Sequence, residues 1–385
     1  MKILFISHEY PPVGGGGSNA CVNLAEQFAN KGHIVHVLTV QFAGTDPAET
    51  THKGRLTVYR VPAKRAYATH SSFLEMLDYL FKANRKAKDL CGRENYDACL
   101  CFFGLPGGVL AQHLKQTYGI PYILRMGGGD IPGGQDRFRL LYKVLSPRLR
   151  RIWKHAGGLV ANSEGLRQNA LKFCSQYKIS VIPNGVDTDL FCPPETVLET
   201  ASDDTVRLLT VCRLIEKKGL QDVIPNLNRI EQQTKKIIRW TIAGDGPYRG
   251  QLETLARQNA AGDRISFLGN QAKDRLPEIY RHADIFIFPS HHEGMPNAVL
   301  EAMSSGLPVI MRKDCQGAEE LIRGNGIAAE GDFGEALTKL IAMDSAAWRQ
   351  MGMRSREWTL ETFTWKHTAE KYETMIENLV RKTDQ

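Results

Sequence analysis

The nine residues Glu293–Glu301, EGMPNAVLE, determine how the second half of the chain folds. They follow an apolar run at 285–288 and open a helical pattern, which predicts a buried strand, a short turn and a helix. Gly294 lets the backbone approach a ligand closely, Pro296 suits the first helical turn and Asn297 is a good cap. The unpaired amides at the start of such a helix suit phosphate or sugar oxygens.

Two carboxylates bracket this turn and helix. Glu293 lies in the turn, and Glu301 lies on the helix whose first amides point to the same place, so both would flank one small ligand. The motif resembles the paired-glutamate signature of the retaining family 4 glycosyltransferases.

The rest of the chain alternates strand and helix patterns in two runs. With 385 residues the chain is too long for one core and fits two domains, separated by a polar, proline-marked connector at 192–205. We predict an α/β protein of two doubly wound domains facing each other across a cleft, with ligands beyond the carboxyl ends of parallel strands. The expected strands are 3–7, 34–40, 56–61, 98–102, 122–124, 158–161 and 179–182, then 206–211, 237–243, 265–268, 284–288 and 308–310.

Composition is that of an ordinary soluble globular protein, with 42% apolar and 24% charged residues. The first apolar run ends at His8 and is too short for the core of a signal peptide or a membrane span, so we expect a cytoplasmic protein. Eight cysteines form neither a disulfide framework nor a paired metal-ligand spacing, and we expect them to be reduced and mostly buried.

Positive charge is concentrated in the first half. Residues 1–190 carry 24 Lys and Arg against 14 Asp and Glu, a net of +10, whereas the whole chain is +7. Seven basic residues lie among apolar ones from Arg137 to Lys154, in an amphipathic segment broken at Pro147. One interpretation is peripheral contact with an anionic membrane, at the inner face of the cell membrane, or with a phosphorylated lipid-linked acceptor. The other is a solvated helix face over a core stripe. Nucleic-acid binding is not expected, because the rest of the chain lacks a basic and aromatic reading module.

Two more motifs follow predicted strands of the second domain. VCRLIEKKG at 211–219 places Arg213 and Lys218 where a guanidinium and an ammonium can neutralise a leaving nucleoside diphosphate. The alternative is a pair of solvated cations at a helix start. AGDGP at 243–247 ends the next strand in a tight turn, which by itself is a common strand-to-helix connection.

GGGGS at 14–18 lies between the first strand and the first helix, where bare amides can approach a phosphate. A rival interpretation is a dinucleotide-binding loop, since Gly15, Gly17 and Ala20 match its permissive form. The intervening YPPV and the lack of an acidic residue after the second strand argue against a nicotinamide or flavin enzyme. The family resemblance implies instead that Gly15 and Gly16 border the donor phosphates from the N-terminal side.

The family 4 resemblance covers nearly the whole chain. It rests on the early double glycine, NGVD at 184–187, RLIEKKG, GDGP, EGMPNAVLE, GLPVI at 306–310 and a terminal FTWKHTAEKY helix. It implies the GT-B fold of two Rossmann-like domains. An acceptor-side domain would span 1–190, a nucleotide-sugar donor domain would span 191–362, and a last helix at 363–385 would cross back to the first domain.

The resemblance also implies the roles of the site residues. Glu301 would bind the donor ribose hydroxyls, Glu293 a sugar hydroxyl, and Arg213 and Lys218 the diphosphate. The backbone amides that would complete the sugar and phosphate site are those of Gly294, Met295, Pro296 and Asn297.

One loop departs from the family pattern. Many members have a His after the strand that corresponds to 122–124, but here the loop reads RMGGGDIPGG. Asp130 in this loop can meet the acceptor or a sugar hydroxyl, or it can cap the turn. The residues expected to carry the chemistry are Glu293, Arg213, Lys218 and Asp130, while the acceptor side and any general base stay open.

The expected chemistry is metal-independent transfer with retention at the anomeric carbon, by attack on the face from which the diphosphate departs. Asp187 and Asp189 resemble part of a metal-binding acidic triplet, but their place in the NGVDTDLF turn favours turn and capping roles. We expect no cofactor. The family resemblance implies a nucleoside-diphosphate sugar as donor substrate, a UDP- or GDP-sugar, and an acceptor hydroxyl in polysaccharide, lipopolysaccharide or glycolipid assembly. The alternatives are an epimerase or phosphorylase on the same fold, or a non-catalytic binding protein.

Overall fold

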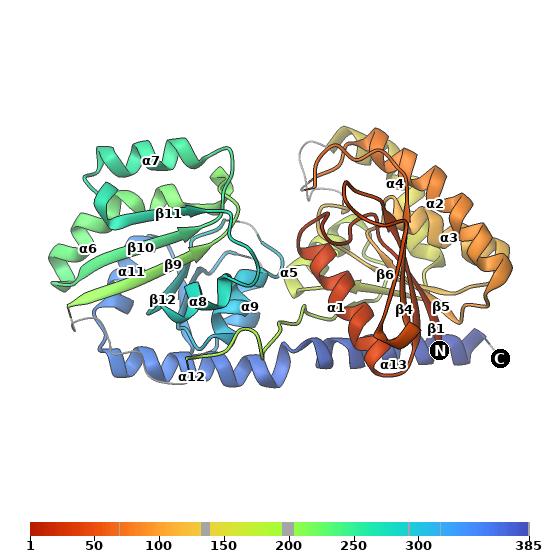
Figure 1. The fold of residues 1–385 in the computed structure, drawn as a ribbon. Coiled ribbons are helices and arrows are strands. Elements are labelled where there is room, and N and C mark those ends of the chain that lie inside the picture. The colour runs from red at the N-terminus through yellow and green to blue at the C-terminus, as the bar shows by residue number, and fades with distance from the viewer. Residues whose placement is uncertain (69, 132–138, 195–203, 292, 316, 384–385) are drawn as a thin grey trace. The chain divides into compact units, whose positions relative to one another are not determined.

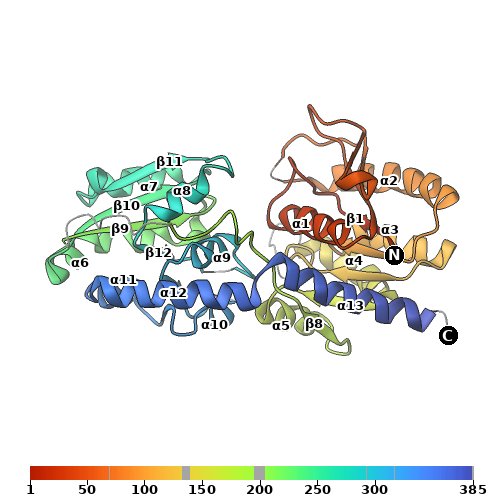
Figure 2. The same ribbon diagram turned by 60° about the horizontal axis from the view of Figure 1, so that its bottom comes forward.

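The computed structural model describes residues 1–68, 70–131, 139–194, 204–291, 293–315 and 317–383. The chain forms two units, one made of Met1–Asn184 and Trp365–Gln385 and the other of Gly185–Thr364 (Figures 1 and 2). Each unit is a mainly parallel sheet with helices on both faces, which confirms the predicted α/β class with two Rossmann-like domains. Among the helices described, none has the length and apolar character needed to span a bilayer.

The sheet of unit 1 has eight strands in the order β3-β4-β2-β1-β5-β6-β7-β8. Only β3 pairs antiparallel, and this exposed polar edge strand was not predicted by the apolar pattern. The strands are β1 Lys2–Ile6, β2 Ile34–Val40, β3 Ala48–Thr51, β4 Leu56–Val61, β5 Ala98–Phe102, β6 Tyr122–Arg125, β7 Gly158–Ala161 and β8 Ile179–Val181.

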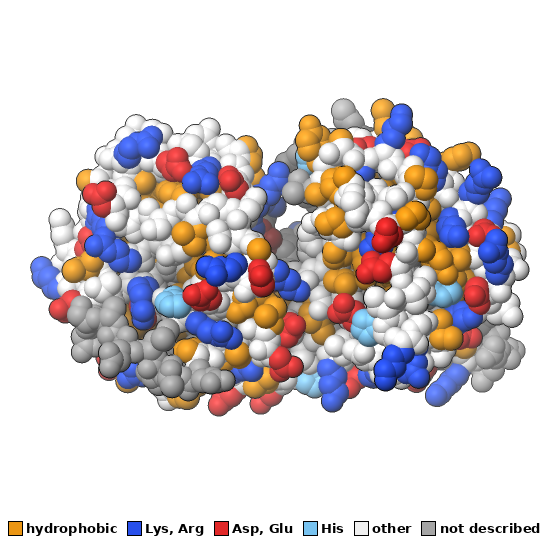
Figure 3. All heavy atoms as spheres, viewed as in Figure 1, with side chains coloured by type: hydrophobic (Ala, Val, Ile, Leu, Met, Phe, Trp, Pro, Cys, Tyr) orange, Lys and Arg blue, Asp and Glu red, His pale blue; other side chains and the backbone are white. Residues whose placement is uncertain are grey.

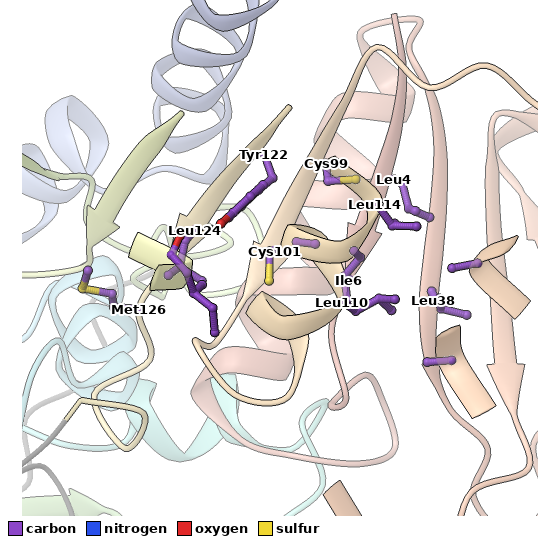
Figure 4. Packing of buried hydrophobic residues seen from close by; sticks show 14 of the residues in the cluster. Leu4, Ile6, Leu38, Cys99, Cys101, Leu110, Leu114, Tyr122, Leu124 and Met126 are labelled. Carbon is purple, nitrogen blue, oxygen red and sulfur yellow. Dashed lines mark hydrogen bonds between the residues drawn. The ribbon is translucent and has the colours of Figure 1, made fainter. Parts of the chain in front are cut away.

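Helices cover both faces of this sheet because its strands alternate between two cores. Leu4 and Ile6 of β1 enter one core with Cys99 and Cys101 of β5 (Figure 4), whereas the neighbours of Leu4 and Ile6 along β1 enter the other. The helices are α1 Gly16–Asn30, α2 Phe73–Arg93, α3 Gly107–Tyr118, α4 Arg139–His155, α5 Glu164–Phe173 and α13 Trp365–Thr383. Residues of α2 to α5 pack in the first core, and α1 and α13 lie side by side over the second.

Helix α4 corrects one prediction. It runs through Pro147, where the sequence was expected to break it. Pro147 is exposed, and Leu149, Ile152 and Trp153 beyond it are buried, with Ile152 and Trp153 in the same core as residues of the sheet. Burial of this stripe offsets the hydrogen bond that a proline removes from a helix.

In unit 2 all the pairs between described strands are parallel, with the order β11-β10-β9-β12-β13-β14. Its strands are β9 Thr205–Val211, β10 Ile237–Ala243, β11 Ile265–Gly269, β12 Ile285–Phe288, β13 Val309–Arg312 and β14 Gly326–Ala329. Its helices are α6 Leu227–Thr234, α7 Arg249–Gln258, α8 Leu276–Arg281, α9 Asn297–Ser304, α10 Ala318–Leu321, α11 Phe333–Ile341 and α12 Ser345–Thr362.

Candidate active site

The predicted site residues of unit 2 lie where the order of its sheet reverses. The chain runs outward from β9 to β10 and β11, then returns to the other side of β9 as β12. The loop after β9 carries Arg213 and Lys218, and the loop after β12 carries Glu293. Ligands of open α/β sheets bind outside the carboxyl ends of the strands at such a point.

Lys218 and Glu293 form an ion pair at this position. Lys218 Nζ lies 2.6 Å from Glu293 Oε1, and the two side chains are only 13% and 20% exposed. Ser290 Oγ lies 3.3 Å from the same oxygen, and the ammonium lies 5.0 Å from the centroid of the Phe288 ring. Arg213 is exposed on the same loop as Lys218. One carboxylate and two cations therefore occupy neighbouring loops at the switch point.

Two glycines allow these loops to pack closely against one another. Gly219, directly after Lys218, has a φ of +70°, and a Cβ there would lie 2.2 Å from the carbonyl oxygen of Pro289. A Cβ on Gly246 would lie 2.1 Å from the carbonyl oxygen of Leu214. No side chain fits at such distances, so the loops after β9, β10 and β12 pack backbone against backbone. The AGDGP turn thus supports the loop that carries Arg213.

Glu301 lies on α9, with a partner that the motifs did not indicate. The hydroxyl of Tyr280 donates a hydrogen bond of 2.8 Å to Glu301 Oε2, and the Tyr280 ring is buried against Phe191 and Phe286. Burial raises the pKa of the Glu301 carboxyl, although the Tyr280 hydrogen bond opposes this shift. Tyr280 comes from the six-residue helix α8, which has no motif that would have identified it.

The start of α9 differs from the prediction. Pro296 is the residue before the helix, with a φ of −76°, and Asn297 is the first helical residue rather than the cap. Met295 and Pro296 are buried, whereas Gly294 and Asn297 are partly exposed. The fixed φ of proline already suits the entry into a helix, so proline can occupy this preceding position.

Unit 1 has a switch point of its own, between β1 and β5. Gly15 precedes α1 and Gly16 begins it, and both are exposed. The Glu9 carboxyl accepts a hydrogen bond from the Gly15 amide and lies 3.8 Å from Arg65. Burial raises the pKa of Glu9, while Arg65 opposes this shift. The sequence motifs did not indicate Glu9 and Arg65, although HEYPP at 8–12, one residue beyond the end of β1, was an available signal.

Asp130 uses both carboxylate oxygens to hold backbone. Oδ2 accepts 2.7 Å from the Gly104 amide, Oδ1 accepts 2.8 Å from the Gly127 amide, and the side chain is buried. Burial raises its pKa, with the two backbone hydrogen bonds acting in the opposite direction. This arrangement matches the turn-capping alternative. Asp187 Oδ1 likewise accepts from the amides of Asp189 and Leu190, as the turn interpretation predicts.

The basic segment is only partly described. Arg137 lies outside the described residues, and α4 begins at Arg139. Arg148, Arg151 and Lys154 are exposed. Arg150 lies 4.9 Å from the centroid of the Phe173 ring and donates to the Phe173 carbonyl, so part of the basic face contacts the protein itself.

Two Rossmann-like units, each with helices on both faces of its sheet, have the architecture of GT-B glycosyltransferases. The family model described as Glycosyl transferases group 1 matches residues 199–356, and the one described as Glycosyltransferase Family 4 matches residues 14–190. The GDP-mannose-dependent alpha-(1-6)-phosphatidylinositol monomannoside mannosyltransferase of Mycobacterium tuberculosis is 30% identical over 389 residues, which cover 96% of each chain. The chain belongs to glycosyltransferase family 4.

Solved structures share the fold. Sucrose-phosphate synthase from Thermosynechococcus elongatus aligns with a TM-score of 0.80 at 21% identity, over 99% of each chain. Anabaena HepE, solved in complex with UDP, aligns with a TM-score of 0.73 at 19% identity, over 98% of this chain and all of HepE. At these identities the likeness concerns the fold.

Proposed function

We propose that unit 2 binds the nucleoside diphosphate of a sugar donor and that the protein transfers the sugar to an acceptor hydroxyl. The Lys218–Glu293 pair at the switch point, with Arg213 on the same loop as Lys218, carries this proposal. Arg213 and Lys218 hold the diphosphate, Glu293 accepts from a sugar hydroxyl and Glu301 accepts from the ribose. The backbone N–H groups of Gly294, Met295 and Asn297 complete the sugar and phosphate contacts, since Pro296 has no N–H to donate.

Lys218 has two partners in turn. Glu293 Oε1 lies 2.6 Å from its ammonium. When a diphosphate binds, its oxygens compete for the same ammonium, which frees Glu293 to accept from the sugar. The cation is therefore in position before the leaving group develops its charge, so it stabilises the transition state without reorganising.

This arrangement supports metal-independent transfer with retention. The bond from the anomeric carbon to the diphosphate oxygen breaks, and a bond from that carbon to the acceptor oxygen forms on the same face. The acceptor proton passes to the departing diphosphate. Glu293 Oε1 also accepts a hydrogen bond of 3.3 Å from Ser290 Oγ, which suits a fixed hydrogen-bond acceptor better than a mobile nucleophile for double displacement.

The donor is a UDP- or GDP-sugar, and the acceptor belongs to polysaccharide, lipopolysaccharide or glycolipid assembly. The mycobacterial relative is named as GDP-mannose-dependent and acts on a phosphatidylinositol monomannoside, and HepE was solved with UDP. We assign Asp130 the task of holding the loop after β6, because both its oxygens already accept from backbone amides.

Thermal stability with nucleotides tests the donor site. The purified protein is heated with UDP, GDP, ADP, CDP and dTDP, each with and without EDTA, because a ligand of the folded state raises its apparent stability. We expect a rise with one base that EDTA leaves unchanged. A rise that EDTA abolishes would refute metal independence, and no rise with any nucleotide would refute the donor site.

Retention is testable without knowing the acceptor. Slow hydrolysis of the donor uses water as the acceptor, and NMR can record the anomer of the released sugar before it equilibrates. We expect the first anomer to match the donor. Initial release of the opposite anomer would show inversion and overturn the same-face mechanism.

A further inference from the structure

Described residues at the end of β13 and just after it pack against the turn that carries Glu293. Arg312, Cys315 and Gly317 each contact a different residue of this turn. None of the three belongs to the motifs that indicated the site. Strands β12 and β13 pair in parallel, so their carboxyl ends are neighbours and the loops that follow them meet at one edge of the sheet.

Arg312 anchors the start of the turn. Its Nε donates a hydrogen bond of 2.9 Å to the Pro289 carbonyl, and its Nη2 pairs with the carboxylate of Asp222. Asp222 lies on the loop after β9, as Lys218 does. Arg312, the last residue of β13, thus ties both loops of the site to the sheet. Because the start of the turn is anchored independently, a change beyond Arg312 acts on the end of the turn, where Glu293 lies.

Cys315 holds the amide of Glu293 itself. The Glu293 N–H donates a hydrogen bond to Cys315 Sγ, and Cys315 is only 2% exposed. Burial, with the negative charge of Glu293 acting in the same direction, raises the pKa of the Cys315 thiol to about 12. The sulfur therefore takes part in the turn as a neutral thiol rather than as a reactive thiolate.

Gly317 fixes the next residue of the turn by close packing. It has a φ of +95°, and a Cβ there would lie 2.4 Å from the carbonyl oxygen of Gly294. No side chain fits at that distance, so the two glycines pack backbone against backbone. Figure 3 shows basic and acidic side chains spread over the face of unit 2 that it draws, whereas Cys315 and Gly317 are buried. Both residues therefore act through the turn that they hold.

We propose that Cys315 and Gly317 are positioning residues that fix Glu293 for recognition of the donor sugar. They hold two successive residues of the turn by backbone groups, which sets the direction in which the Glu293 side chain leaves the chain. A recognition group must stay within about 0.5 Å of its productive position. The inference rests on the proposed function, in which Glu293 accepts from a sugar hydroxyl. It adds that these two residues govern binding of the sugar, while the cations after β9 bind the diphosphate.

Calorimetric titration of the full chain with a nucleoside diphosphate and with its sugar conjugate tests the proposal. The probes are UDP with UDP-glucose and GDP with GDP-mannose, and the pair that the wild type binds is used. Cys315→Ala removes the acceptor of the Glu293 amide, whereas Cys315→Ser keeps one. Gly317→Ala drives a Cβ onto the Gly294 carbonyl. Gly331→Ala is its matched control, because Gly331 has a φ of +70° but its Cβ would have no described heavy atom within 4 Å.

The measured quantity is the affinity for the sugar conjugate relative to that for the diphosphate. We expect this ratio to fall at least about tenfold in Cys315→Ala and Gly317→Ala, which is the effect of one lost hydrogen bond to a charged group. Cys315→Ser and Gly331→Ala should keep the wild-type ratio. A merely structural role would lower the free energy of unfolding and leave the ratio unchanged.

The wild type and the variants separate this inference from the proposed function. A wild-type ratio in both Cys315→Ala and Gly317→Ala, or an equal fall in Cys315→Ser or Gly331→Ala, would overturn the inference and leave the donor site standing. If the wild type binds neither diphosphate, the proposed donor site fails, and the inference fails with it.

Discussion

Replacing Lys218 with Met separates the structural and functional roles of the ion pair. The Met side chain keeps the apolar stem against Phe288 and removes the charge that lies 2.6 Å from Glu293 Oε1. Glu293 then remains as a carboxylate that is only 20% exposed and has lost its ammonium partner. Breaking a fully buried pair costs about 3–5 kcal/mol and an exposed pair about 0.2–1 kcal/mol. We expect Lys218→Met to lower the free energy of unfolding by about 2 kcal/mol.

A double-mutant cycle completes this prediction. Adding Glu293→Gln removes the unpaired charge and should restore most of the stability, so that the cycle completed with Glu293→Gln alone gives a coupling energy of about 2 kcal/mol. Nucleoside diphosphate binding should stay at least about tenfold weaker in both variants, because a lost charged hydrogen bond costs about 1.5–3 kcal/mol. Lys217→Met, on the same turn but exposed, is the matched control. Urea unfolding and calorimetric titration measure the two quantities. Wild-type stability in Lys218→Met, or wild-type affinity in the double variant, would contradict the reasoning.

Four further outcomes are expected. Tyr280→Phe should raise the donor KM several-fold while kcat changes less, because Glu301 loses the hydrogen bond that orients it; an unchanged KM in initial-rate assays would remove Tyr280 from the site. Glu301 has a raised pKa in the folded state, so its contribution to stability falls as the pH rises from about its unfolded value of 4.5 through the folded one. Urea unfolding at several pH values measures this fall, and Glu301→Gln should make the free energy of unfolding depend less on pH. The same pH dependence in the variant and the wild type would contradict the burial of the Glu301 carboxyl. Gly246→Ala should lower the free energy of unfolding by more than 1 kcal/mol, about the minimum cost of such strain, because its Cβ would meet the Leu214 carbonyl; a neutral effect would contradict the packing. Asp130→Asn should cost about 1–3 kcal/mol of stability yet retain most donor turnover in the protein that remains folded, and a large fall in kcat would restore a catalytic role.

The strands were predictable because buried parallel strands are continuous apolar runs. Five expected ranges, 34–40, 56–61, 98–102, 158–161 and 237–243, coincide with β2, β4, β5, β7 and β10. The sequence analysis missed the edge strands β3 and β14. Strand β3 is polar and exposed, and β14 has four residues, GIAA, of which three are glycine or alanine. Pairing at an edge depends on a neighbouring strand rather than on burial of the segment's own side chains.

The site was predictable in its parts and less so in its contacts. Motifs at the ends of strands indicated Lys218, Glu293 and Glu301, because parallel topology brings those ends to one edge. The direct Lys218–Glu293 hydrogen bond joins residues 75 positions apart and depends on the loop packing around Gly219. Tyr280 contacts Glu301 through tertiary packing alone, so no local pattern reveals it.

Unit 1 is not contiguous in the sequence, and this bears on how the protein folds as it is made. Trp365, Ala369, Tyr372 and Ile376 of α13 belong to the same buried core as α1. The ribosome must therefore add the 192 residues from 185 to 376 before that core can close, which takes about 10–40 s at ordinary rates of synthesis. Unit 2 is continuous and can finish first, so the N-terminal unit is the later one to reach its final structure. Until then the core residues that α13 covers, beside α1, stay without that cover.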